Sequence, residues 1–239
     1  MPIDRSFLEK IEEMSADFKG MEFFNLPHTS KQVYRVRRPL SAIIAASSLS
    51  AVVTYFIDKN SEMNEPLIHV VSPDTVTIYS ALGVDDRERE SYLTSILISD
   101  PFRFGRFMDI EMFVIALQSQ FIQDETTAAI LKVVGNLTEE AEQRVLDDGV
   151  SQTVTAKAGI AKVENVHVPN PVILRPFRTF REVEQPSSKF VFRMKKSRDG
   201  EGPQCALFEA DGGAWKHVAM ERISGFLVDL LPDGVTVIA

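Results

Sequence analysis

The stretch Pro171–Trp215, PVILRPFRTFREVEQPSSKFVFRMKKSRDGEGPQCALFEADGGAW, decides the fold that we predict for this chain. Three of its segments, at 172–184, 189–195 and 204–209, are rich in β-forming residues and are bounded by turn residues. Consecutive segments of this kind, joined by short polar loops, are typical of antiparallel strands. We therefore predict a three-stranded antiparallel meander.

An amphipathic helix is expected directly after the meander. Apolar residues recur every three to four positions from Trp215 to Leu230, and Pro232 ends the pattern. This spacing places apolar side chains on one face of a helix. We expect the helix to fold back onto the sheet, with Trp215 as its large anchor and Asp211 as its N-terminal cap.

Upstream of the meander the same two patterns predict further helices and strands. Ser48 and Asp109 are each followed by an apolar stripe at helical spacing, so both are expected to be helix N-caps. Helices are expected at 3–18, 49–59, 110–121 and 126–136. Strands are expected at 67–71 and 75–81, which form a hairpin, and at 150–156.

The segment Pro101–Phe107 alternates phenylalanine with arginine or glycine. On a strand this period of two places the aromatic rings on one face and the arginines on the other. Two interpretations are open: a buried aromatic row with exposed arginines, or a surface that stacks nucleic-acid bases.

These elements together predict an α+β protein with a mainly antiparallel sheet, packed helices and a C-terminal helix folded back on the sheet. The stretch at 138–148 is charged and has only a weak hydrophobic pattern, so we expect the boundary between two lobes there. We therefore expect an N-terminal α+β lobe at 1–138 and a C-terminal meander plus helix at 139–239, which together form one compact unit.

The amino-acid composition restricts the binding partners and the cellular location that we expect for this protein. The formal charge of −8 argues against nonspecific binding of nucleic acid, which requires clustered lysine and arginine. A single cysteine, Cys205, excludes an internal disulfide framework and fits a reducing cytoplasm. The apolar window 40–57 is interrupted by serine and threonine, and the N-terminus is acidic, so we expect neither a membrane span nor a secretory signal.

No recognised catalytic motif occurs, and the histidines lack the spacing of a preassembled metal site. We therefore expect no cofactor, no metal and no enzymatic activity. An enzyme that uses Glu182, Glu184, Glu209 and Asp211 is the remaining catalytic alternative, because paired carboxylates can act as acid and base. The more direct interpretation of Glu182 and Glu184 is a charged strand edge or a salt-bridge row.

Polar and aromatic side chains of the stretch Pro171–Trp215 are the candidate ligand-binding residues. The arginines among them raise the possibility of an anion site, although 178 and 181 fall on opposite faces of a regular strand. A second arginine group lies at 35, 37 and 38. The candidate site residues are Arg175, Arg178, Arg181, Glu182, Glu184, Gln185, Glu209, Asp211 and Trp215.

Four segments resemble an uncharacterised family of phage and prophage accessory proteins. They are Asp147–Gln152 (DDGVSQ), Pro176–Pro186 (PFRTFREVEQP), Leu207–Lys216 (LFEADGGAWK) and Phe102–Phe121 (FRFGRFMDIEMFVIALQSQF). The resemblance implies a viral or prophage origin and an accessory role inside the host cell, outside the virion. It supplies no catalytic residues.

The leading hypothesis is therefore a non-enzymatic phage accessory protein in the host cytoplasm that sequesters a host defence factor or a nucleotide signal. One alternative is a replication or recombination accessory whose acidic surface docks onto a DNA-processing enzyme. Another is an oligomeric structural component built through strand edges or the first helix.

Overall fold

The computed structural model describes residues 21–23, 26–28, 42–59, 63, 65–83, 87–135, 144–147, 152–157, 163–167, 170–196 and 202–239. The chain divides into two units, 1–41 and 42–239. In the first unit, β1 (Met21–Phe23) pairs antiparallel with β2 (Leu26–His28). The expected helix at 3–18 and the arginines at 35, 37 and 38 lie outside the described residues.

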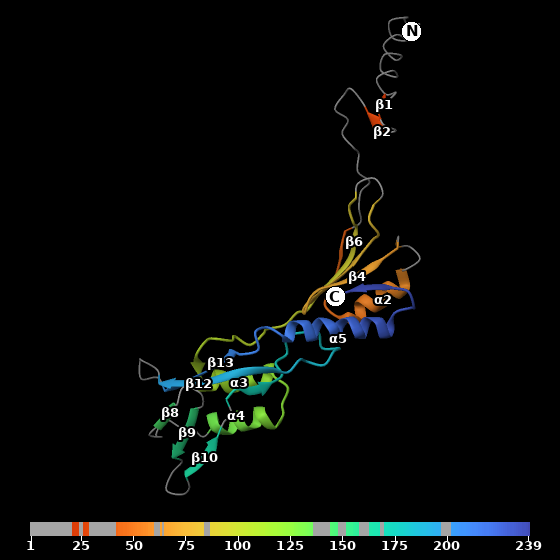
Figure 1. Cartoon of the computed structure of the whole chain (residues 1–239). Helices are drawn as coiled ribbons and strands as arrows, with labels where there is room; N and C mark the ends of the chain where they lie inside the picture. The colour runs from red at the N-terminus through yellow and green to blue at the C-terminus, as the bar shows by residue number, and fades with distance from the viewer. Residues whose placement is uncertain are drawn as a thin grey trace, which may run out of the picture. The chain divides into compact units, whose positions relative to one another are not determined.

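A five-stranded sheet forms one half of the second unit. Its order is β14-β4-β5-β6-β3, with antiparallel pairing in the centre and parallel pairing at both edges. Helices α2 (Leu49–Lys59) and α5 (Trp215–Leu230) lie side by side on one face of it (Figure 1). The strands are β3 (Ile44–Ala46), β4 (Leu67–Ser72), β5 (Thr75–Tyr79), β6 (Ser91–Ile96) and β14 (Thr236–Ile238).

Alternating apolar residues explain why this sheet and its helices pack together. Ile68 and Val70 of β4 are fully buried, as are Val76 and Ile78 of β5, so each strand turns every second side chain toward the helices. We call the resulting cluster the α2 core. Its main members from the helices are Leu49, Val52, Val53, Phe56, Ile223 and Leu227.

A second, four-stranded sheet carries the other core. Its order is β11-β12-β13-β7, and every pair in it is antiparallel. Helices α3 (Ile110–Gln120) and α4 (Glu125–Gly135) pack on it through Phe113, Leu117 and Ile130, and we call this cluster the α3 core. The strands are β7 (Met108–Asp109), β11 (Val172–Leu174), β12 (Ser188–Lys196) and β13 (Pro203–Glu209).

Three more strands, in the order β10-β9-β8, form a separate antiparallel sheet. They are β8 (Arg144–Asp147), β9 (Gln152–Lys157) and β10 (Val163–His167). The mostly antiparallel sheets, together with a C-terminal helix packed on a sheet, confirm the predicted α+β class. The sheet that α5 packs on is the five-stranded one, formed largely by the first half of the chain.

Two of the three expected helix N-caps, Asp109 and Ser48, are present. The backbone N–H of Met112 donates to Asp109 Oδ1 at 2.8 Å, and the N–H of Ala51 donates to Ser48 Oγ at 3.2 Å. Each bond satisfies a donor that the first helical turn cannot pair internally.

The predicted strand at 172–184 is wrong beyond Leu174. β11 ends there, and the chain continues as an irregular segment, 175–187, that we call the connector. A single bridge joins Pro176 to Phe121, and turns follow. The apolar residues of the connector do not serve one sheet face, because Phe180 and Val183 enter the α2 core.

The predicted strand at 101–107 is also wrong. Gly105 adopts a φ of +73°, and its N–H donates to the Leu207 carbonyl at 2.8 Å, so a turn interrupts the alternating pattern. Phe102 and Phe104 nevertheless pack in or against the α3 core, and Phe104 stacks on Phe190 with ring centroids 4.9 Å apart. Two of the three phenylalanines of this segment therefore pack on the α3 core from a turn, whereas Phe107 lies against Phe208, with ring centroids 5.9 Å apart.

The two cores are not divided at position 138 of the chain. Residues on both sides of that position build the α2 core and the α3 core alike. In the part of the chain that the structure describes, no helix is long and apolar enough to cross a membrane.

Candidate functional site

Gln185 fixes the shape of the connector. Its side-chain oxygen accepts from the backbone N–H groups of Arg178 and Thr179 at 3.0 and 3.1 Å. Its amide nitrogen donates to the carbonyls of Thr179 and Phe180 at 3.1 and 3.0 Å. Because Gln185 is only 3% exposed, these bonds replace the water that the backbone of an irregular segment otherwise requires. Gln185 is a structural residue of the site.

Arg178 is the centre of the candidate site. Its side chain is 5% exposed, and its Nη1 donates to Glu209 Oε1 at 2.7 Å. Asp211 Oδ2 lies 4.0 Å from its Nη2, which also donates to Ser188 Oγ. The guanidinium stacks over the Trp215 ring, 3.8 Å from the centroid. Burial lowers the pKa of Arg178 to about 10, and the two carboxylates oppose that shift.

Asp211 joins the turn before α5 to this cluster. Burial raises its pKa, but hydrogen bonds from Ser188 and from the Gly213 N–H, together with the charge of Arg178, more than offset that effect and hold the pKa below 3.8. The Gly213 N–H donates to Asp211 Oδ1 at 3.0 Å. The expected role of Asp211 as the helix N-cap is wrong, because the N-cap position is Ala214, which has no side-chain cap.

Two nitrogen atoms of this cluster are buried and have no hydrogen-bond partner among the described residues: Arg178 Nε and the indole Nε1 of Trp215. The two groups belong to the stacked pair. The guanidinium is therefore oriented by the hydrogen bonds of its Nη groups to Glu209 and Ser188, and the indole is oriented by its stacking on the guanidinium.

A groove of about 480 Å³ lies beside the cluster, at the N-terminal end of α5, and we call it the α5 groove. Trp215 and Asp211 line it, and so do Ser188 and Lys189 of β12. Apolar side chains complete the wall, among them Ile173 and Val218, which are 55% and 37% exposed. The groove thus combines the Trp215 indole ring, which stacks on Arg178, with exposed aliphatic side chains and the exposed side chain of Lys189.

Arg175 belongs to a different cluster. Its Nη2 lies 3.5 Å from Asp124 Oδ2, and its Nη1 lies 3.9 Å from Glu184 Oε1. Glu184 also pairs with Arg222 of α5 at 3.2 Å. Burial raises the pKa of Asp124, but hydrogen bonds from Thr127 and the charge of Arg175 bring it below its ordinary value. These contacts tie the connector to α4 and α5.

Glu182 caps a helix that lies far from it in the sequence. Its Oε1 accepts from the backbone N–H groups of Leu49 and Ser50, at 2.8 and 3.2 Å, at the start of α2. Arg181 is exposed, and its guanidinium stacks over the Phe177 ring at 3.7 Å. Glu182 and Glu184 therefore do not form the predicted row on a strand, since the connector is irregular and sends them to different partners.

Of the nine predicted site residues, the structure brings four together: Arg178, Glu209, Asp211 and Trp215. It separates Arg175, Arg181, Glu182 and Glu184 from them, and Gln185 holds the backbone. Sequence reasoning missed Ile173 and Lys189, which face each other across the β11–β12 pair. Their alternation with the buried Val172 and Phe190 was the available signal.

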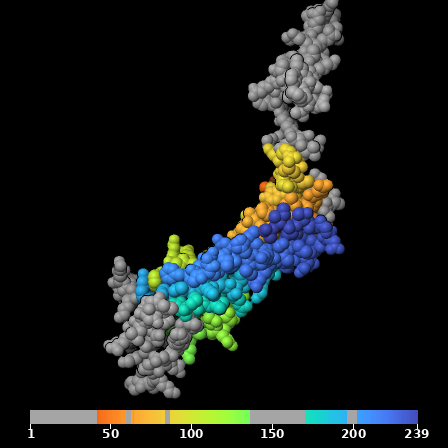
Figure 2. Space-filling view, viewed as in Figure 1, coloured from red at the N-terminus to blue at the C-terminus, as the bar shows by residue number. Residues whose placement is uncertain are grey.

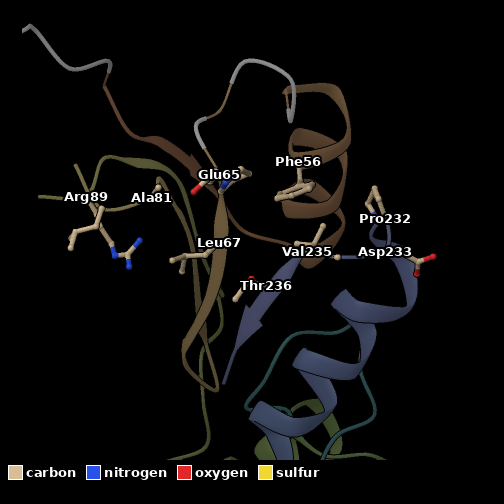
Figure 3. Close-up of a pocket in the computed structure, with 12 residues that line it drawn as sticks. Phe56, Glu65, Leu67, Ala81, Arg89, Pro232, Asp233, Val235 and Thr236 are labelled. Atoms are coloured by element: carbon tan, nitrogen blue, oxygen red, sulfur yellow. The ribbon is translucent and has the colours of Figure 1, made fainter. Parts of the chain in front are cut away.

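A second cavity, of about 590 Å³, lies at the β14 end of the five-stranded sheet. Figure 3 shows Arg89 and Ala81 on one side of Leu67, with Phe56 and Pro232 on the other. Arg89 donates to the Ser80 carbonyl at 2.7 Å. None of the nine predicted residues lines this cavity.

Within the described residues, no group of three or more His, Cys, Asp or Glu side chains is placed to hold a metal ion. Cys205 is buried in the α3 core, and burial raises the pKa of its thiol to about 12. A thiol with so high a pKa carries almost no thiolate at neutral pH and is a poor nucleophile.

Comparison with protein-family models, curated proteins and solved structures found no match to this chain.

Proposed function

We propose that this chain is a non-enzymatic phage or prophage accessory protein that binds a segment of another protein in the α5 groove. The observation that carries the proposal is the Trp215 ring, which lines the groove and is held from behind by the buried Arg178 guanidinium. An aromatic side chain fixed in this way loses little conformational freedom on binding. The phage setting rests on the sequence resemblance alone.

The charges around the groove favour a protein segment over a nucleotide. Glu209 and Asp211 already neutralise Arg178, and both carboxylates repel phosphate. Lys189 is the cation that remains on the groove wall, opposite the exposed Ile173. The complementary ligand is therefore an apolar side chain beside a single carboxylate, which is the chemistry of a short peptide segment.

Photo-crosslinking in cells of the native host tests this proposal. A photoreactive phenylalanine replaces Val218, which is 37% exposed and lines the groove, in the full chain. We expect a covalent adduct with one discrete protein, whose identification separates a defence factor from a DNA-processing enzyme. Adding Lys189→Glu should abolish the adduct, because the carboxylate of the partner then meets a like charge.

Lys216→Glu is the matched control. Lys216 is exposed on α5 and carries the same charge, but it does not line the groove, so the adduct should persist. An adduct that survives Lys189→Glu overturns the assignment of the site. Two results overturn the proposal itself. One is a nucleotide bound to the chain in native mass spectrometry, and the other is the absence of any crosslinked protein.

A further inference from the structure

The four-stranded sheet has a face that points away from α3 and α4. Both helices pack on the face that carries Phe190, Phe192 and Leu207. Because side chains alternate along a strand, the residues between these three point to the opposite face. By register that face consists of Ile173, Lys189, Val191, Arg193, Lys195, Gln204, Ala206, Phe208 and Asp109.

Two aromatic rings lie on the β12–β13 part of this face. The ring of Phe107, just before β7, contacts the Phe208 ring with centroids 5.9 Å apart, and Lys195 Nζ lies 4.2 Å from the Phe107 centroid. The N–H of Gly105 donates to a carbonyl of β13 and so holds the loop of Phe107 against the sheet. Both rings are partly exposed. We call the surface formed by Phe107, Phe208, Arg193 and Lys195 the β12 platform.

The charges around the two rings are almost all positive. Lys195 is exposed, and so are Arg103 and Arg106 in the loop that carries Phe107. Neither these three cations nor Arg193 forms an ion pair with a carboxylate of the described residues. Among the described strand residues of this face, the one carboxylate is that of Asp109, which already accepts a hydrogen bond at the start of α3.

Arg193 also has a hydrogen-bond donor to offer. Its Nη1 is buried and has no hydrogen-bond partner among the described residues, although the side chain as a whole is partly exposed. A buried donor without an acceptor costs free energy. An anionic group bound beside Arg193 would supply that acceptor.

We propose that the β12 platform binds single-stranded nucleic acid. Unstacked bases pack on exposed aromatic rings, while lysine and arginine side chains beside the rings pair with the phosphates. The net charge of −8 is an average over the whole chain, whereas the fold collects Arg103, Arg106, Arg193 and Lys195 around two rings. That is the local cluster of cations that phosphate binding requires.

The interleaved rings favour nucleic acid over an acidic protein segment. Every base has a flat aromatic face that stacks on a ring, and aspartate and glutamate side chains have none. A duplex hides these faces in its own stack, so the ligand is single-stranded. The platform lies about 13 Å along β12 from Lys189 of the α5 groove, so this inference stands apart from the proposed function.

Fluorescence anisotropy of a labelled thymidine oligonucleotide of about 15 nucleotides, titrated with the full chain up to about 100 µM, tests the proposal. We expect saturable binding at about 50 mM salt. Raising the salt to about 200 mM should weaken the binding roughly fiftyfold, as four phosphate contacts to a single strand predict. A uridine oligonucleotide of the same length, measured in parallel, shows whether DNA or RNA binds more tightly, and binding of either supports the proposal.

Two variants separate the phosphate contacts from the stacking. Lys195→Gln should weaken binding and reduce the slope of log affinity against log salt by about 0.7, because one phosphate contact is lost. Phe107→Leu should weaken binding about tenfold and leave that slope unchanged, because it removes a stacking ring and no charge. Lys195 is exposed and Phe107 lies outside both cores, so each substitution leaves the cores intact.

Lys132→Gln is the matched control for the loss of charge. Lys132 is exposed on α4, which packs on the opposite face of the same sheet, so this variant should bind as the wild type does. The proposal is overturned if neither oligonucleotide shows saturable binding up to about 100 µM. It is also overturned if a base-free sugar-phosphate chain of the same length binds as tightly, or if Lys132→Gln weakens binding as much as Lys195→Gln.

Discussion

Arg178 is a buried charge that has partners on every side except one. Glu209 and Ser188 accept hydrogen bonds from its Nη groups, and Asp211 lies 4.0 Å from Nη2 as an ion-pair partner. The Trp215 ring covers one face of the guanidinium, and among the described residues Nε has no hydrogen-bond partner. Removing one member of such a cluster leaves the others buried and unpaired, and this costs more than the pair itself contributes. The cluster is therefore a rigid support for Trp215.

The carboxylate of Asp211 makes the free energy of unfolding depend on pH. Its pKa is lower in the folded chain than the ordinary 3.8, so the stabilisation it contributes is complete above that value. The stabilisation is lost as the pH falls through the folded pKa, when the carboxylate gains a proton and loses its attraction to Arg178. Asp211→Asn should therefore reduce the free energy of unfolding at about pH 6 and much less at about pH 3.

Urea unfolding of wild type and Asp211→Asn at several pH values between about 3 and 6 measures this difference. The exposed Asp229 of α5 provides the control substitution, Asp229→Asn. A difference between Asp211→Asn and wild type that stays constant with pH would show that the carboxylate charge does not stabilise the fold.

At the scale of elements, the connector caps a helix that the sequence places more than a hundred residues earlier. Glu182 accepts two N–H groups at the start of α2, next to the local cap Ser48. Glu182→Ala removes both bonds and the favourable interaction with the helix dipole. We expect a loss of about 1–2 kcal/mol in the free energy of unfolding, measured by chemical denaturation.

Glu184→Ala is the matched control for that prediction. Glu184 also lies in the connector, but its side chain is 64% exposed and its ion pairs face solvent. Such pairs contribute little, and we expect a loss of no more than about 0.5 kcal/mol. Equal losses for the two variants would rule out the special role of Glu182.

At the scale of the whole molecule, the chain crosses between its two cores several times. α5 comes from the end of the chain and completes the α2 core, and Phe180 and Val183 enter the same core from the connector. A fragment 42–138 lacks all of these residues, although it contains most of the five-stranded sheet. We expect this fragment to show no cooperative thermal unfolding by circular dichroism, because it lacks a third of the buried residues of the α2 core and half of those of the α3 core.

The chain 42–239 is the control for the fragment, and it should unfold in a cooperative transition. A sharp transition in 42–138 would show that its sheet and α2 are stable without α5.

Figure 2 shows the outer side of α5 as a continuous surface, and its solvent-facing residues include His217 and Glu221.

Within the described residues, the sequence by itself determined which four segments are helices and where two of them begin. The stripes of α2, α3 and α5, and the caps Ser48 and Asp109, depend on contacts within a few residues, and local contacts leave a periodic signal. The antiparallel pairing of β12 with β13 followed in the same way, from one polar loop between two β-rich segments.

Only the tertiary structure decided what the connector does. Its apolar residues alternate as they would on a strand, but Gln185 satisfies its backbone, and Phe180 enters a core built largely by distant segments. The partners of Glu182 and Arg178 likewise come from α2, β12 and β13. Contacts between residues far apart in the chain leave no periodic mark on either segment, so the candidate site became visible only after both sheets were in place.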